Sequence, residues 1–172
     1  MNFNHCPKCT SKNIEMPNNR FMKCLDCEFT YYHNTAAAVA GILVCGNEVL
    51  LNVRQKEPGK DKWDLVGGFV DYEETLEQAL SRETDEELGI KVENWIYLCS
   101  FPNTYTYRNV TYHTMDAVFF SELRQKPKLH LQTSEVSKAT WVTLDKVPLS
   151  GFAFGSLSKA MTFFIDQKLK SL

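Results

Sequence analysis

The sequence predicts an α/β (α+β) protein in which helices pack on a mixed β-sheet, with a small cysteine-rich unit ahead of it. Three observations support this fold class. Strand-like apolar runs and two helix-like segments follow one another without regular alternation, which argues against a doubly wound parallel fold. Four of the six cysteines fall within the first 27 residues. The rest of the chain is long enough for one globular domain with its own core.

Composition and charge exclude several classes of protein. Hydrophobic residues make up 44% of the 172 residues and charged residues 23%. These values are ordinary for a globular chain and exclude a disordered or fibrous one. The 19 Lys and Arg residues face 21 Asp and Glu residues, which gives a net charge of −2. A globally basic nucleic-acid-binding protein is therefore excluded.

The sequence gives no sign of a membrane or export signal. The longest apolar run lies at about residues 35–45 and is too short to cross a bilayer. The first residues lack the basic and apolar regions of a signal peptide. We therefore expect a cytoplasmic protein with no membrane partner. Because that compartment is reducing, the cysteines need a role other than disulfide formation.

The N-terminal cysteines form two C-x2-C pairs, Cys6 with Cys9 and Cys24 with Cys27, separated by fourteen residues. Two such pairs can place four thiolates around one tetrahedral Zn²⁺; disulfides or free thiols are the alternatives. Since cysteines fill all four positions, the ion should stabilise the fold and perform no chemistry. We predict a structural zinc ribbon over residues 1–34, whose charge balance of +1 makes nucleic acid an unlikely partner.

Residues 35–172 form the second predicted domain. A continuous run of small apolar residues at 36–45 predicts a strand buried on both faces, and the turn Gly46-Asn47 leads into a second strand. Gly89 is expected to end the first helix. The expected strands are 36–45, 48–54, 63–66, 90–101, 110–120 and 139–142, and the expected helices are 73–88 and 156–170.

Carboxylates are concentrated in the first predicted helix. Residues 71–87 contain eight acids and one arginine. At helical spacing, the apolar stripe that begins at Leu76 continues with Glu83 and Glu87, and Glu86 lies at its edge. A solvated helix face is the alternative. Carboxylates crowded on an inward face would raise one another's pKa, and a hard divalent cation such as Mg²⁺ or Mn²⁺ would relieve their repulsion.

The same segment resembles the signature of a known family. Gly68, Glu74 and the run Arg82–Ile90 match the Nudix box, G-x5-E-x7-R-E-U-x-E-E-x-G-U, at every charged and glycine position, with threonine at the first bulky aliphatic position U. The preceding W-D-L-V-G-G at 63–68 is similar to the family's W-x-L-P-G-G. The resemblance covers about residues 35–170 and implies a Nudix-type α/β/α sandwich with a mixed sheet, to which the zinc ribbon is an N-terminal addition.

The resemblance also implies roles for individual residues. The implied ligands of Mg²⁺ or Mn²⁺ are Glu83, Glu86, Glu87 and the carbonyl oxygen of Gly67. Glu74 and Arg82 would form a structural ion pair. A later loop would supply one more acidic residue; Glu135, in a segment similar to the family's E-[IV]-x-x-A-x-W, is favoured over Glu122 at a strand end. The catalytic base could be either Glu83 or Glu135.

A zinc ribbon ahead of a Nudix domain resembles the NADH pyrophosphatase subgroup, which carries S-Q-P-W-P-F-P-x-S after the box. Here residues 100–107 read S-F-P-N-T-Y-T-Y, without the tryptophan. Aromatic residues in this region could stack on a nucleobase or serve only to anchor the loop, and arginines could meet phosphate. The candidate substrate-binding residues are Phe101, Pro102, Asn103, Tyr105, Tyr107 and Arg54, with Tyr112 and Arg108 as further candidates.

The resemblance implies a Mg²⁺- or Mn²⁺-dependent hydrolase. It would cleave the pyrophosphate bond of a nucleoside diphosphate linked to another group, in NADH-like, ADP-ribose-like or related dinucleotides, and release a mononucleotide. One alternative is a catalytically idle ligand sensor whose ribbon binds nucleic acid or protein. Another is an isoprenoid diphosphate isomerase, which needs a catalytic cysteine, for which Cys99 is the candidate. Family analogy also suggests a homodimer.

Overall fold

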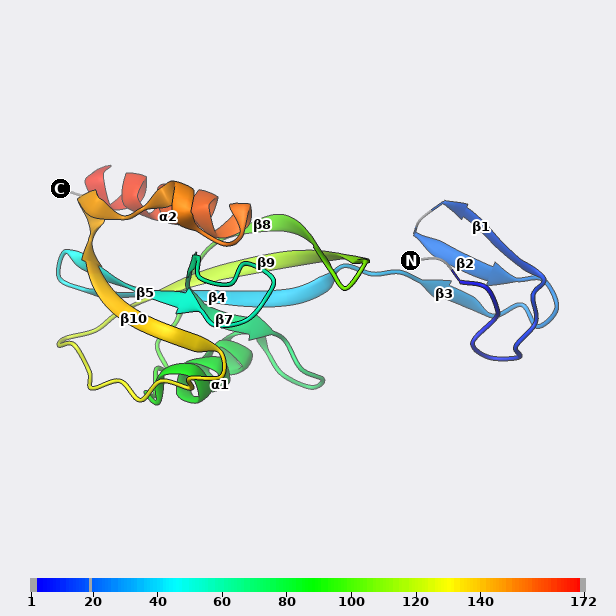
Figure 1. The fold of residues 1–172 in the computed structure, drawn as a ribbon, viewed down its shortest axis with the longest axis horizontal. Helices are drawn as coiled ribbons and strands as arrows, with labels where there is room; N and C mark the ends of the chain where they lie inside the picture. The colour runs from blue at the N-terminus through cyan, green and yellow to red at the C-terminus, as the bar shows by residue number, and fades with distance from the viewer. Residues whose placement is uncertain (1–2, 19, 171–172) are drawn as a thin grey trace.

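The computed structural model describes residues 3–18 and 20–170, which form a three-stranded sheet and a seven-stranded sheet. Residues 1, 2, 19, 171 and 172, which the predicted domains include, lie outside this description. In Figure 1 the small sheet lies at one end of the molecule, and the large sheet lies between two helices. The small sheet has the order β1-β2-β3, formed by β1 (Ile14–Asn18), β2 (Phe21–Cys24) and β3 (Thr30–Tyr32).

The large sheet is mixed, as the sequence predicts, with the order β10-β5-β4-β9-β8 and with β6 and β7 paired to β5 and β4. Its strands are β4 (Ala36–Cys45), β5 (Glu48–Arg54), β6 (Trp63–Asp64), β7 (Val66–Phe69), β8 (Ile96–Tyr107), β9 (Val110–Glu122) and β10 (Val136–Thr143). The helices are α1 (Leu76–Leu88) and α2 (Gly155–Lys170), and short 3-10 turns cover Leu144–Lys146 and Leu149–Gly151.

Strand β4 organises this sheet. One side of it pairs in parallel with β9 from Ala36 to Val44. The other side is shared: β7 pairs antiparallel with residues 38–41, and β5 pairs antiparallel with Val44 and Cys45 only. Strands β5 and β7 therefore pair with different parts of the same edge of β4, and both border the pocket described below.

The two helices cover opposite faces of the sheet, which gives an α/β/α sandwich (Figure 1). Helix α2 buries Leu157, Met161 and Phe164 against a core on its side of the sheet. Helix α1 buries Leu80 and Leu88 on the other side. Among the described residues, neither helix combines the length and apolar character that a membrane span requires.

The first helix begins later than the sequence predicts. Glu73 has a positive φ of 66°, so it cannot belong to the helix. Thr75 is the N-cap: its hydroxyl accepts from the Gln78 N–H, and the Gln78 side chain accepts from the Thr75 N–H. This capping box was present in the sequence as T-x-x-Q. The predicted end at Gly89 is confirmed, since Gly89 is the left-handed C-cap.

Several strand boundaries also differ from the prediction: β9 continues to Glu122 instead of residue 120, and β10 spans Val136–Thr143 instead of 139–142. Strand β7 does not end at its glycines but runs through them to Phe69, because Gly67 and Gly68 pair with β4. Strand β8 begins at Ile96 instead of residue 90 and extends to Tyr107. It pairs with β9 down to a two-residue turn, Arg108-Asn109, in which both residues have positive φ. The pairing partner, which single-strand periodicity does not reveal, sets these limits.

The four N-terminal thiols are gathered as the zinc hypothesis requires. Their Sγ atoms all lie within 4.8 Å of one another, with 3.7 Å between Cys6 and Cys27 and 3.6 Å between Cys9 and Cys24. A tetrahedron with Zn–S bonds of about 2.3 Å has edges of about 3.8 Å, so the cluster fits this ion. All six cysteines are free thiols, which excludes the disulfide alternative. Outside this cluster, Cys45 on β4 and Cys99 on β8 are half-buried.

Replacing one thiol of this cluster should release the metal. In Cys24→Ser, three thiolates remain, and we expect zinc content to fall well below about one ion per chain and the small sheet to lose stability. Metal analysis by mass spectrometry and amide exchange over residues 3–32 would measure both effects. Cys45→Ser, outside the cluster, is the matched control. Unchanged zinc in Cys24→Ser would contradict a four-thiolate site.

Candidate active site

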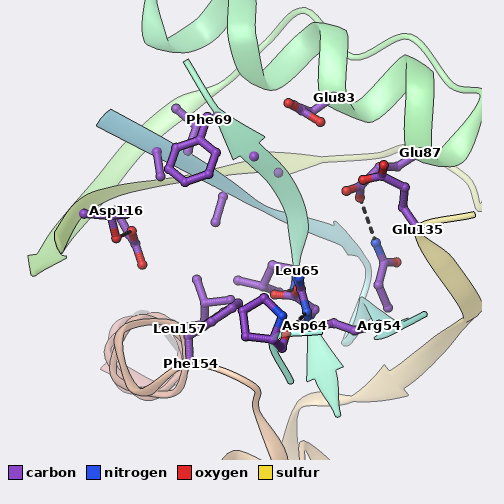
Figure 2. Close-up of a pocket in the computed structure, with 18 of the residues that line it drawn as sticks. Arg54, Asp64, Leu65, Phe69, Glu83, Glu87, Asp116, Glu135, Phe154 and Leu157 are labelled. Carbon is purple, nitrogen blue, oxygen red and sulfur yellow. Dashed lines mark hydrogen bonds and ion pairs between the residues drawn. The ribbon is translucent and has the colours of Figure 1, made fainter. Parts of the chain in front are cut away.

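A pocket of about 570 Å³ opens where β4, β5 and β7 separate. Helix α1 and the start of β10 border one side of it, and the β8–β9 hairpin and the start of α2 border the other. Figure 2 shows carboxylates of Glu83, Glu87 and Glu135 near one another at the first side, with Asp116, Phe154 and Leu157 away from them. The pocket thus has an acidic side and a more aromatic side.

The acidic side depends on how closely α1 approaches β7. Glu87 is 8% exposed and accepts a hydrogen bond of 3.3 Å from the Asn52 amide. Glu83 lies over Gly68, where an added Cβ would be 2.3 Å from its Oε1 atom. Gly67 has φ 149°, and a Cβ there would be 2.1 Å from the Val39 carbonyl oxygen. Glycine at both positions therefore allows helix, strand and carboxylates to meet.

Arg82 joins several groups at this side of the pocket. Its Nε and Nη2 atoms donate to the two carboxylate oxygens of Glu74 at 2.8 and 3.0 Å, which is the contact expected from the sequence. Its Nη1 atom donates to Glu83 at 2.8 Å and to Glu86 at 3.3 Å, and Nη2 also donates to the Phe69 carbonyl at 3.1 Å. The guanidinium thereby fixes the loop before α1 to the helix.

Not all the predicted metal ligands lie in the pocket. Glu83 and Glu87 line it, as does Gly67, whereas the Glu86 side chain is 54% exposed and does not. Among the described residues, the four thiols are the only group of three or more candidate ligands whose atoms all lie within 4.8 Å. The pocket carboxylates are spread more widely, and Arg82 occupies one oxygen of Glu83.

The structure separates the two candidates for the later acidic residue. Glu135, immediately before β10, lines the pocket and pairs with Lys56 at 3.0 Å. Glu122, at the end of β9, is exposed, pairs with Lys168 and does not line the pocket. The geometry therefore agrees with the preference for Glu135.

Burial and mutual repulsion dominate the electrostatics. Burial raises the pKa of Glu87 to about 9, and the charges of Asp64, Glu83 and Glu135 add to the shift. Burial likewise raises the pKa of Glu83, against the opposing effect of Arg82. Carboxylates in this arrangement resist simultaneous ionisation, and a divalent cation bound by oxygen ligands would compensate them. The donor set thus fits Mg²⁺ or Mn²⁺.

The more aromatic side contains half of the predicted substrate-binding residues. Tyr105 stacks on Tyr112 with ring centroids 5.3 Å apart and lies 5.6 Å from the Phe154 ring. Asn103, Tyr105 and Tyr107 alternate along β8 and all line the pocket, as does Tyr112. Their period of two places them on one face of the strand.

Three other candidates are placed differently. Phe101 packs against the core beneath α2, and Pro102 lies exposed on the opposite face of β8, so neither lines the pocket. Arg108 lies over the Tyr107 ring at 5.2 Å and is also outside it. The sequence suggested these residues by their chemical type. The face of β8 on which Phe101 and Pro102 lie could be known only from the pairing of that strand with β9.

Arg54 lines the pocket, yet its charge is already partnered. Its Nη1 atom pairs with Asp64, Nε donates to the Pro58 carbonyl at 2.7 Å, and the guanidinium lies 5.0 Å from the Phe154 ring centre. Burial raises the pKa of Asp64, and the Arg54 charge opposes that shift. Arg54 therefore positions Asp64 and Phe154, and Asp64 already compensates its charge.

Sequence reasoning missed three buried amide or carboxylate residues of the pocket: Asn52, Asp64 and Asp116. Each interrupts an apolar strand, as in L-L-N-V, W-D-L-V and M-D-A-V. A single amide or carboxylate inside such a run costs free energy unless it is hydrogen-bonded, and this was the available signal.

With this geometry in place, comparison with known proteins identifies the family. The family model of the NUDIX domain matches residues 34–159, so the chain belongs to the Nudix family. The chain is 29% identical over 147 residues to the NAD-capped RNA hydrolase NudC of Haemophilus influenzae, covering 82% of this chain and 52% of that protein. It thus spans about half the length of the curated relatives it matches.

Solved structures show the same fold. A NUDIX hydrolase from Nitrosomonas europaea superposes with a TM-score of 0.67 at 21% identity, covering 96% of this chain and 92% of that one. The MutT NUDIX hydrolase of Burkholderia pseudomallei superposes with a TM-score of 0.60 at 26% identity, covering 67% and 88%. The first alignment includes most of the N-terminal unit as well as the sandwich.

The raised pKa of Glu87 predicts an unusual stability profile without divalent metal. The folded state holds a proton that the unfolded state releases near pH 4.5, so this stabilisation is complete below that pH and is lost as the pH rises towards about 9. Urea unfolding at several pH values between about 5 and about 9 should show stability falling with pH, and falling less steeply in Glu87→Gln. Equal slopes would contradict a proton on Glu87.

Proposed function

We propose that this chain is a Mg²⁺- or Mn²⁺-dependent hydrolase that cleaves a pyrophosphate bond in a dinucleotide-like substrate and releases a mononucleotide. One observation carries the proposal: Glu83, Glu87 and Glu135 line the same pocket as Gly67, and the pocket continues to an aromatic wall. The diphosphate would lie at the acidic side and a nucleoside at the aromatic side.

In this proposal Glu83, Glu87 and the Gly67 carbonyl would hold the metal, and Glu135, immediately before β10, lies on the same side of the pocket. Glu86, exposed on α1, would take part only by way of a water or a second ion. When bound, a metal ion there would neutralise charge on the phosphate oxygens and lower the pKa of a nearby water. Glu83 or Glu135 would accept a proton from the attacking water, and Arg82 holds Glu83 in place.

The substrate class rests on the pocket and the relatives together. Tyr105 and Tyr112 offer stacking surfaces for a base, and Asn103 beside them offers amide hydrogen bonds. The curated relatives are named as hydrolases of NAD-capped RNA. A dinucleotide of the NAD or ADP-ribose type fits both facts.

We further propose a division at residue 34, with a structural Zn²⁺ in the N-terminal ribbon and catalysis in residues 35–172. The alternative of an idle sensor is disfavoured because the pocket keeps its carboxylates. The isomerase alternative is disfavoured because Cys99 packs against the core under α2 and does not line the pocket.

A panel of dinucleotides and nucleotide sugars, incubated with Mg²⁺ or Mn²⁺ and read out by the nucleotide released, tests the activity. We expect Glu87→Gln to lower turnover roughly 100-fold or more, because it removes a metal ligand. Glu77→Gln makes the same change on an exposed part of the same helix and is the matched control. Turnover near normal in Glu87→Gln would contradict the metal-ligand role.

The contact between Gly68 and Glu83 gives a second test. A methyl group at position 68 would overlap the Glu83 carboxylate, so Gly68→Ala should displace it and lower turnover roughly tenfold or more, with little loss of folding. Gly155→Ala, where an added Cβ meets nothing within 4 Å, is the control. Thermal unfolding of both variants would show that the fold is retained, and equal turnover would exclude the proposed contact.

A further inference from the structure

The pocket contains a buried carboxylate that the proposed chemistry does not use. Asp116, on β9, is 6% exposed and lines the pocket on the side of α2. Figure 2 places it away from Glu83, Glu87 and Glu135. It therefore belongs to the part of the pocket assigned to the nucleoside and not to the metal.

Two neutral hydroxyl groups hold this carboxylate. Thr114 donates to Oδ1 at 2.6 Å, and Ser156, at the start of α2, donates to Oδ2 at 2.5 Å. Both residues are buried. In the described part of the chain no cationic side chain forms an ion pair with Asp116; Arg54, which lines the same pocket, is paired with Asp64. Two hydroxyl groups thus hold the Asp116 carboxylate in position, and no cationic side chain of the described residues is paired with it.

A carboxylate has about four lone-pair positions, and these two hydroxyls use two of them. The remaining positions can accept hydrogen bonds from a ligand in the cavity. Tyr105, whose ring forms part of the stack with Tyr112, is close enough for the Asp116 charge to raise its pKa, although burial is the larger cause. A base or ribose held by this stack would therefore lie within reach of Asp116.

We propose that Asp116, positioned by Thr114 and Ser156, is a specificity-determining residue that accepts a hydrogen bond from a donor group on the nucleoside half of the substrate. The donor is the ribose 2′-hydroxyl or an exocyclic amino group, which share this chemistry. The same negative charge excludes a phosphate from that position. The inference rests on the proposed function for the identity of the ligand, but not for its test.

Binding of mononucleotides in the presence of Mg²⁺ tests this inference, since none of them contains a pyrophosphate bond to be cleaved. The probes are AMP, 2′-deoxy-AMP, adenosine 2′,5′-bisphosphate and IMP, measured by calorimetry. Loss of about tenfold or more in affinity for 2′-deoxy-AMP, with still weaker binding of the bisphosphate, identifies the ribose hydroxyl. The same loss for IMP alone identifies the amino group. Equal affinity for all four nucleotides, or no binding of any, would overturn the proposal.

The variant Asp116→Asn tests the residue itself. We expect it to lose the discrimination among the four nucleotides and, in turnover of an accepted dinucleotide, to raise KM about tenfold while changing kcat little. Asp166→Asn, an exposed position on α2, is the matched control. Discrimination retained by a folded Asp116→Asn would overturn the assignment. If the variant does not fold, the wild-type nucleotide series still decides. An inactive wild-type protein that discriminates among the nucleotides would reject the proposed activity and leave this inference standing.

Discussion

The close approach of α1 to β7 is the constraint on which the site depends. Two side chains are absent there, at Gly67 and Gly68, and the space they leave is filled by backbone and by the Glu83 carboxylate. The pairing of β7 with only part of β4 brings these glycines to the mouth of the pocket. Without that approach the helix would still pack through Leu80 and Leu88, but its acidic half would face open solvent instead of a cavity.

The site gathers negative charge and partly compensates it within the protein. Among the pocket carboxylates, Glu83 and Asp71 pair with Arg82, Glu135 pairs with Lys56, and Asp64 pairs with Arg54. In the described residues the only side-chain partner of Glu87 is the neutral amide of Asn52, and burial raises the pKa of Glu87 to about 9. Such uneven compensation leaves one position where an added cation would have the largest effect.

Much of this arrangement could be predicted from the sequence. The spacing of Glu83 and Glu87 on an apolar stripe follows from helical geometry alone, and so does the four-thiolate pattern of the ribbon. The sequence did not reveal which β-strands pair with one another. The direction of Pro102, the length of β8 and the place of Asp116 depend on a partner strand that is distant in the chain, and no local period encodes it.

The turn that closes the β8–β9 hairpin affects the aromatic wall. Arg108 and Asn109 both adopt left-handed backbone conformations, with φ of 47° and 63°, and an arginine in that region costs roughly 1–2 kcal/mol. Tyr105, Tyr107 and Tyr112 stand within a few residues of this unfavourable bend. The end of the β8–β9 hairpin should therefore fray more readily than the strands around β4. The three tyrosines would then lie on a less stable part of the sheet than the carboxylates on the acidic side of the pocket.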